Sequence, residues 1–429
     1  MIPPVLLTLR LWGNSSHMAY LESQVQQHLT GGKETLVTYK SVSHGGFLTY
    51  DGVDVNGKRI CDEILTKTDQ LQATGKVVKL SIIGYSLGGL ISRYAIGILY
   101  TRGYFDTVTP VNFITFCSPH VGVPHPKASK AMFVYNRIAP KFLALTGDQI
   151  FLCDKVTIDG ESAPLLVRLS DSNSYFFHGL SKFKYKVLYA NAVNDKRCAY
   201  YTASISDIDP FHSVSNKDAD RISASFIDGY APTIVDLTKP ISVLDRAQRA
   251  KEVQKTWKQF FMRRYRWLNV FLNIMIYTPF WGLTFITNSI IERVKLIRRL
   301  SAFHKDESNN FNHLYTPVKS EDRGILNAYE ISSNDRVYDQ KESIVESLYG
   351  AINNEVQEEN LTAGDKVNLS PSQLSIVNNL NKLNWKKHAV IIRKAKTTHA
   401  AAIYRHEDPT FEEGKVVVKH FVENSFKFD

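Results

Sequence analysis

Three residues far apart in the chain are of the types that together hydrolyse an ester. Ser86 lies in G-Y-S-L-G-G, Asp195 follows Y-A-N-A-V-N, and His399 lies in T-T-H-A-A. A serine hydroxyl is a weak nucleophile until a histidine accepts its proton. The histidine in turn needs a carboxylate that fixes its tautomer and stabilises its charged form. These residues therefore predict acyl transfer by a catalytic triad.

The residues around Ser86 predict the elements that would hold it. The run V-V-K-L-S-I-I (Val77–Ile83) is β-branched and apolar and predicts a strand, and Leu87–Tyr100 has the spacing of a helix. A serine between such elements takes a strained backbone that lifts its side chain above the sheet, and Gly84 and Gly88 keep Cβ atoms out of the turn. The alternative is an ordinary strand-to-helix turn.

Strand-like and helix-like runs alternate along the first 235 residues. Further strands are predicted at Val5–Thr8, Val111–Cys117, Lys186–Val193 and Ala389–Arg393, and further helices at Met18–Leu29, Ser370–Leu383 and 412–426. This alternation predicts an α/β fold with a mostly parallel sheet flanked by helices, and the serine motif makes it an α/β hydrolase. In that fold the acid follows a later strand and the histidine follows the last one, as Asp195 and His399 do here.

Other residues compete for the two partner roles. The alternatives are two acids, Asp207 and Asp209, and two histidines, His388 and His406. Neither acid directly follows a strand-like run. His388 begins the last predicted strand and would lie at its wrong end, and His406 is a turn beyond His399. His120 comes too early in the chain to be the base, and we expect it to have a packing role.

Several motifs resemble those of the serine esterases and lipases of fungi, a family with the α/β-hydrolase fold. They are L-W-G-N-S-S-H (Leu11–His17), T-Y-D-G-V-D-V-N-G-K-R (Thr49–Arg59), C-S-P-H-V-G-V (Cys117–Val123), N-D-K-R-C-A-Y-Y-T-A (Asn194–Ala203) and the tail Leu380–Ile403. The resemblance covers nearly the full chain. It implies that Ser86, Asp195 and His399 form the triad and that the amides of Leu11 and Leu87 form the oxyanion hole. It also implies a phospholipid substrate at lipid droplets.

One departure from the family pattern concerns the oxyanion hole. The family has His-Gly where this chain has Leu9-Arg10, in the loop that we expect after the strand Val5–Thr8. Glycine lets such a loop turn toward the oxyanion, whereas arginine is less permissive about φ. Either the hole is poorly formed, or residues 1–10 are not the native start of the protein.

The composition is that of a globular protein without a cofactor motif. The chain has 429 residues, 44% apolar and 22% charged, which allows a large core. The four cysteines have neither metal-ligand nor disulfide spacing, so we expect no metal and no other cofactor. Cys117 and Cys198 are expected to be buried as small apolar residues. The N-terminus lacks the pattern of a secretory signal.

The net charge of +10 lies in one region of the chain. Residues 246–300 contain 12 Lys and Arg against 2 Glu, and they enclose 25 uncharged residues, Trp267–Ile291. Internal asparagines, Pro279 and basic residues on both sides favour a hairpin or interfacial helices over a single membrane crossing. We therefore expect residues 263–299 to bind a lipid-droplet or membrane surface, and no nucleic acid. A single span and a buried lid are the alternatives.

The expected organisation has four parts. They are the N-terminal part of the hydrolase core (1–245), the basic and apolar insertion (246–300), a polar loop-rich insertion (301–370) and the C-terminal part of the core (371–429). The expected function is hydrolysis of acyl esters of glycerophospholipids at a lipid droplet or the cytosolic face of an intracellular membrane. The alternatives are a catalytically impaired hydrolase fold that binds lipid surfaces, and a thioesterase or deacylase of lipidated proteins.

Overall fold

The chain divides into two compact units. In this computed structural model the described residues are 4–11, 18–28, 35–72, 75–124, 130–158, 160–211, 222–243, 291, 293–306, 314 and 366–428. One unit combines Met1–Ser242 with Ser308–Asp429, and the other is Val243–Glu307. In the second unit, residues 293–305 are helical. Most of the predicted insertion 301–370 lies outside the described residues, and so does the apolar stretch 267–291 apart from Ile291.

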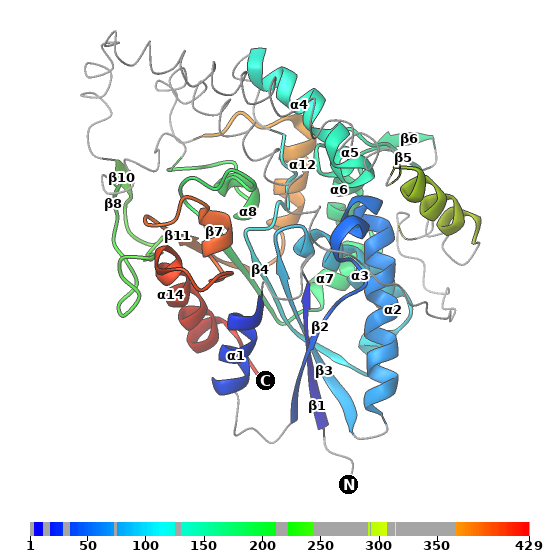
Figure 1. Ribbon diagram of the computed structural model, residues 1–429, viewed down its shortest axis with the longest axis horizontal. Coiled ribbons are helices and arrows are strands. Elements are labelled where there is room, and N and C mark those ends of the chain that lie inside the picture. The colour runs from blue at the N-terminus through cyan, green and yellow to red at the C-terminus, as the bar shows by residue number, and fades with distance from the viewer. Residues whose placement is uncertain are drawn as a thin grey trace. The chain divides into compact units, whose positions relative to one another are not determined.

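A seven-stranded sheet forms the centre of the first unit, in the order β2-β1-β3-β4-β7-β11-β9 (Figure 1). The strands are β1 (Pro4–Leu11), β2 (Thr35–Lys40), β3 (Lys76–Tyr85), β4 (Thr109–Phe116), β7 (Tyr185–Asn191), β11 (Trp385–Val390) and β9 (Ile234–Val235). All neighbouring pairs are parallel except β11 and β9. The carboxyl ends of the parallel strands therefore lie at one end of the sheet, where the loops that follow them can meet.

Helices cover both faces of this sheet. The described α-helices of the first unit are α1 (Ala19–His28), α2 (Val53–Leu71), α3 (Gly88–Thr101), α4 (Lys130–Phe142), α5 (Ala144–Ile150), α6 (Leu165–Ser170), α7 (Tyr175–Ser181), α8 (Tyr200–Ala203), α12 (Pro371–Leu380), α13 (Thr398–Ala401) and α14 (Glu412–His420). Figure 1 shows α2, α3 and α7 on one face and α1 and α14 on the other. The last six residues of β3 and the last seven of β4 are buried. Burial on both faces explains why these strands are mostly apolar rather than alternating.

The close approach of α3 to β3 depends on two glycines. A Cβ atom on Gly84 would lie 2.7 Å from the Cα of Gly89. A Cβ atom on Gly89 would overlap the side chain of Ser118. Without these side chains the helix can begin directly after the strand, so the intervening turn is held tightly.

The predicted fold class is confirmed, with corrections at two strands. The loop expected after Thr8 is wrong, because β1 continues through Leu11 and Arg10 pairs with Lys40 on one side and Ile83 on the other. The last strand also begins earlier than predicted. β11 starts at Trp385 because its polar first residues pair with β7, so His388 lies inside the strand and not at its start.

The helix predicted at Ser370–Leu383 is confirmed at its start. Ser370 accepts a hydrogen bond from the Gln373 amide at 3.3 Å, and the Gln373 side chain accepts one from the Ser370 amide at 3.0 Å. This reciprocal cap fixes the first turn of α12, which ends at Leu380. Within the part of the chain that the structure describes, no helix has the length and apolar character needed to cross a membrane.

Candidate active site

Ser86 occupies the turn between β3 and α3. Its φ is 52°, in the left-handed region that non-glycine residues rarely adopt. Two backbone hydrogen bonds hold it there: the Ser86 amide donates to the Phe116 carbonyl at 2.9 Å, and the Ser86 carbonyl accepts from the Gly89 amide at 3.2 Å. Such strain costs about 1 to 3 kcal/mol and persists only where the surroundings enforce it. The backbone is therefore shaped to present this side chain at the carboxyl end of β3.

Leu87 directly follows Ser86 and is the N-cap residue of α3. The first amides of a helix have no partner within the helix, and the helix dipole adds partial positive charge at this end. A negative charge that develops beside Ser86 would therefore meet favourable backbone dipoles. The role of the Leu87 amide as an oxyanion donor stays a prediction.

Asp195 lies in the loop that follows β7, and four donors converge on its carboxylate. Oδ1 accepts hydrogen bonds from the amides of Arg197 at 3.0 Å and Cys198 at 2.9 Å. Oδ2 accepts one from the Asn191 side chain at 3.0 Å. The fourth donor is His399, whose Nδ1 lies 3.0 Å from Oδ1 and 2.8 Å from Oδ2. The carboxylate is held in one orientation by contacts on both oxygens.

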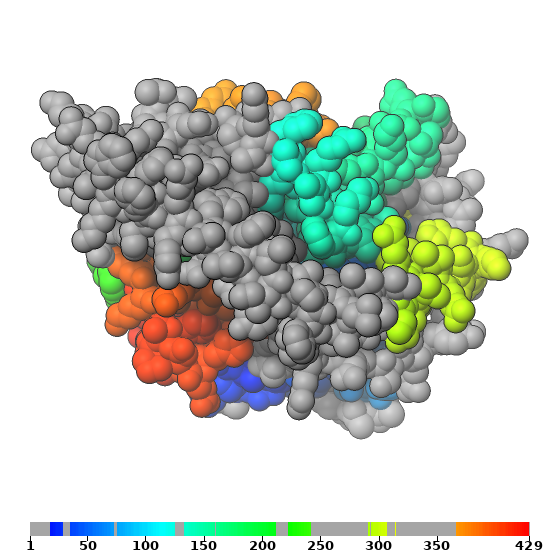
Figure 2. Space-filling model, turned by 45° about the horizontal axis from the view of Figure 1, so that its top comes forward, coloured from blue at the N-terminus to red at the C-terminus, as the bar shows by residue number. Residues whose placement is uncertain are grey.

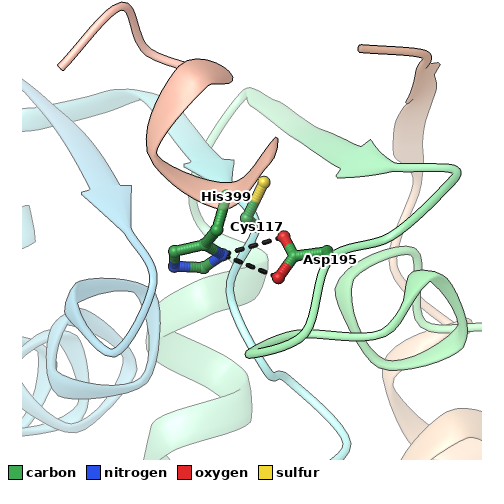
Figure 3. A group of neighbouring side chains, drawn as sticks. All are labelled: Cys117, Asp195 and His399. Atoms are coloured by element: carbon green, nitrogen blue, oxygen red, sulfur yellow. Dashed lines mark hydrogen bonds and ion pairs between the residues drawn. The ribbon is translucent and has the colours of Figure 1, made fainter. Parts of the chain in front are cut away.

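His399 lies on the short helix α13, beyond the end of β11, and reaches Asp195 across 204 residues of sequence (Figure 3). Thr398 ties the two loops together by donating to the Asn194 carbonyl at 2.8 Å. Tyr85 donates to the His399 carbonyl at 3.0 Å, and its ring centroid lies 5.0 Å from that of His399. The histidine therefore packs against the residue that precedes Ser86.

The hydrogen bond to Asp195 determines what the other ring nitrogen can do. When Nδ1 carries the proton that is donated to the carboxylate, Nε2 is left as an acceptor. Among the described residues, His399 Nε2 is buried and has no hydrogen-bond partner. A buried acceptor without a partner is suited to take a proton from a reacting group.

The pKa of Asp195 reflects these contacts. Burial by itself raises the pKa of this carboxyl group, but the charge and the hydrogen bond of His399, and then the amides of Cys198 and Arg197, lower it below its ordinary value. Asp195 is therefore ionised at neutral pH. In this state it can only accept hydrogen bonds, which suits a residue that orients a histidine.

Cys117 is a neighbour of this pair that the sequence did not identify as part of the site. It follows β4 with a φ of 48°, and its Sγ and the nearest ligand atoms of Asp195 and His399 all lie within 4.8 Å of one another (Figure 3). Burial, and next the charge of Asp195, raise the pKa of the Cys117 thiol well above its usual range. The expected burial of Cys117 is confirmed, at 1% exposure.

This trio is a possible metal-ligand set by residue type, but its chemistry does not favour a metal. A cysteine binds a metal as the thiolate, and here burial and a neighbouring carboxylate keep the thiol protonated. Both oxygens of Asp195 are already occupied by hydrogen bonds. The arrangement fits a carboxylate that orients a histidine better than it fits a metal centre.

The competing acids and histidines lie elsewhere. Asp209 is buried and accepts a hydrogen bond from the Phe211 amide in its own turn, at 3.0 Å. His388 stacks on Tyr189 inside β11, where burial lowers its pKa to about 3. His406 is exposed.

His120 is fully buried, and its Nε2 contacts the Thr115 hydroxyl at 2.9 Å. Burial, and next the charge of Arg93, lower the pKa of His120 well below its usual value. Arg93 also donates to the His120 carbonyl at 3.1 Å. These contacts are typical of a residue packed in the protein interior next to β4.

The second predicted oxyanion donor, Leu11, is the last residue of β1. It pairs in the sheet with Gly84, two residues before Ser86. The strand thus carries the Leu11 backbone to the same end of the sheet as the serine turn. Residues 12–17, which follow, lie outside the described residues.

Comparison with known proteins identifies related sequences. Residues 5–207 match the family described as "Putative serine esterase (DUF676)". The chain is 27% identical over 255 residues to "Putative lipase C4A8.10" of Schizosaccharomyces pombe, covering 57% of this chain and 32% of that protein. It is 30% identical over 210 residues to "Putative lipase ROG1" of Saccharomyces cerevisiae, covering 48% of this chain and 29% of that protein. The chain therefore spans about a third of the length of these relatives.

The extent of the family match bears on the site. Ser86 and Asp195 lie within residues 5–207, whereas His399 lies far beyond them. The association of His399 with the matched region comes from the folded chain, through the pairing of β11 with β7. The family match confirms the predicted resemblance to serine esterases over residues 5–207, which is less of the chain than the nearly full length expected from the motifs.

Proposed function

We propose that the chain hydrolyses acyl esters through a triad of Ser86, His399 and Asp195, and the match of residues 5–207 to the family described as "Putative serine esterase" supports this. The observation that carries the proposal is the hydrogen-bonded pair of Asp195 and His399. It is buried, it packs against Tyr85, and it leaves Nε2 of His399 as a free acceptor within the described residues.

The proposed reaction proceeds in two halves. Ser86 Oγ attacks the acyl carbon while His399 Nε2 accepts its proton, and Asp195 stabilises the imidazolium that forms. The Leu87 amide, and in the proposal that of Leu11, donate to the oxyanion. The imidazolium then protonates the departing alcohol, which leaves an acyl-serine ester. A water molecule, deprotonated by Nε2, then attacks the acyl carbon. The acyl–Oγ bond breaks, the fatty acid leaves, and the imidazolium returns the proton to Ser86 Oγ.

The proposed substrates are glycerophospholipids at a lipid droplet or the cytosolic face of an intracellular membrane. The names of the relatives support an acyl-ester lipid. The helical residues 293–305 support a lipid surface, since Val294 and Ile297 are 42% and 56% exposed among several arginines and lysines. Apolar and cationic side chains on one helix favour binding at an anionic interface.

A fluorophosphonate probe tests the proposed chemistry. We expect the probe to label the purified chain covalently, and Ser86→Ala to abolish labelling and the hydrolysis of a phospholipid panel. Ser92→Ala is a matched control, since Ser92 is buried in α3 and its hydroxyl donates to the Gly88 carbonyl in the preceding helical turn. A folded wild-type chain that neither reacts with the probe nor cleaves any ester would refute the proposal and favour a lipid-binding protein with an impaired site.

The substrate panel separates the remaining alternative. Parallel assays use dispersed phospholipids and acyl thioesters of a lipidated peptide. Faster turnover of the thioester would assign the same residues to deacylation of proteins.

A further inference from the structure

Helix α4 exposes an unusual amount of apolar surface. Phe133, Val134, Ile138 and Phe142 are 52%, 51%, 50% and 46% exposed. Val134, Ile138 and Phe142 lie at four-residue intervals and therefore one above the other along the helix, and Phe133 is exposed directly before them. A contiguous apolar face of this kind in contact with water marks an interaction surface. We call these four residues the α4 face, and the helix lies at the molecular surface in Figure 2.

A neighbouring side of α4 is packed, so the helix has a fixed orientation. Tyr135 and Ala139 are 8% and 4% exposed. The Tyr135 ring lies 6.0 Å from that of Phe151, directly after α5. The α4 face is therefore directed away from the protein by its own buried side.

The charges of α4 indicate what would cover this face. Arg137 and Lys141 are exposed beside the apolar side chains, and the helix sequence contains no acidic residue. Lys141 has a carboxylate neighbour, Asp148, at 3.8 Å, in a solvent-exposed pair that contributes little. Apolar side chains flanked by cations on one helical face match an anionic phospholipid surface, in which the apolar groups enter the acyl boundary and the cations contact headgroups.

The position of α4 connects this face with the candidate site. The helix follows β4 and the segment that begins at Cys117, at the carboxyl end of the sheet. That segment is tied to α8, which follows Asp195: the Val121 amide donates to Thr202 at 3.0 Å, and Tyr201 donates to the Pro124 carbonyl at 2.9 Å. A surface bound by α4 would thus lie at the same end of the sheet as Ser86.

We propose that the α4 face docks onto anionic phospholipid surfaces and presents the carboxyl end of the sheet to them. This role is separate from the basic and apolar region 263–299. The reason for such docking, access of the site to lipid, rests on the proposed function. Lipid binding itself does not require a working serine.

The test measures binding in the full chain carrying Ser86→Ala, so that no lipid is hydrolysed. Two vesicle types are used, one of phosphatidylcholine alone and one that also contains phosphatidylserine. Val134→Asp with Ile138→Asp is compared with a control of equal charge, Thr107→Asp with Ser162→Asp, at exposed positions off the helix. We expect the α4 variant to bind anionic vesicles at least about tenfold more weakly, and the control to bind as the parent does.

A second measurement reports on α4 alone, since region 263–299 could also bind vesicles. A nitrobenzoxadiazole label is attached at Ile138→Cys, with Cys153→Ser to remove the exposed native thiol. We expect its emission to rise and shift to the blue on anionic vesicles, and a label at Thr107→Cys, at the opposite end of β4, to remain unchanged.

Three results would overturn the proposal. The first is unchanged vesicle binding by the α4 variant. The second is a label at position 138 that stays in water while the chain is bound. The third is a wild-type dimer in light scattering that the α4 substitutions convert to monomer, which would assign the face to a second copy of the chain.

Discussion

Replacing Asp195 by asparagine should separate the orientation of His399 from the fold of the site. The amide oxygen can take the place of Oδ1, where the amides of Arg197 and Cys198 already donate. The amide nitrogen must then lie at Oδ2, because in the other orientation it would face both backbone donors. At Oδ2 it meets the Asn191 side-chain nitrogen at 3.0 Å and the Nδ1 of His399 at 2.8 Å.

This geometry allows an estimate of how much turnover Asp195→Asn would lose. The new amide can donate to His399 only if Nδ1 gives up its proton, which moves to Nε2. Nε2 is then a donor and cannot accept the Ser86 proton. In the triad logic this costs about ten-thousandfold in turnover, or about 5.5 kcal/mol of transition-state free energy. Stability should fall less, by about 1 to 3 kcal/mol, because the Asn191 side chain is left facing another donor.

The assay is hydrolysis of a soluble p-nitrophenyl ester, with the rate of fluorophosphonate labelling measured in parallel. Urea unfolding of the same samples shows whether the variant is folded. Asp209→Asn is the matched control, since Asp209 is equally buried but accepts a hydrogen bond within its own turn. If Asp195→Asn kept its rate within about tenfold while Asp209→Asn lost it, the assignment of the acid would be wrong.

Three further predictions concern other parts of the structure. Gly84→Ala should lower the free energy of unfolding by at least about 3 kcal/mol in urea, because its Cβ would meet backbone atoms of Gly89 at 2.7 and 2.8 Å. Asp154→Asn should flatten the pH dependence of the melting temperature. Burial raises the pKa of Asp154 from 3.8 to about 7, so the folded state keeps a proton that the unfolded chain loses, and wild-type stability falls as the pH rises between these values. Cys117→Ala should keep ester hydrolysis within about threefold, and a chelator should leave it unchanged, since Asp195 retains its other donors.

The controls for these predictions use the same chain. Gly229 has a φ of 82°, and a Cβ atom added there would have no atom within 4 Å. Gly229→Ala therefore isolates backbone strain and should lower the free energy of unfolding by only about 1 kcal/mol. Equal pH slopes for wild type and Asp154→Asn would show that this carboxyl group does not titrate near neutral pH. Loss of activity on chelation, restored by zinc, would instead make the trio of Cys117, Asp195 and His399 a metal site.

The sequence by itself determined the features that depend on neighbouring residues. The strand, the turn and the helix around Ser86 follow from a β-branched run, small residues and helical spacing within about twenty positions. The cap of α12 could likewise be predicted, because Ser370 and Gln373 satisfy each other's amides one turn apart. The boundaries of β1 and β11 could not be predicted, since charged residues such as Arg10 and Lys386 join a strand only because neighbouring strands offer them hydrogen bonds.

Only the tertiary structure decided how the distant parts of the site meet. Asp195 and His399 are 204 residues apart, and they come together because β11 pairs with β7 in parallel, which brings the loops after both strands to one end of the sheet. The approach of Cys117 to this pair follows from the place of β4 beside β7. The exposure of the α4 face was likewise decided by the tertiary structure. A sequence pattern gives a helix two faces, but only packing decides which face the protein buries.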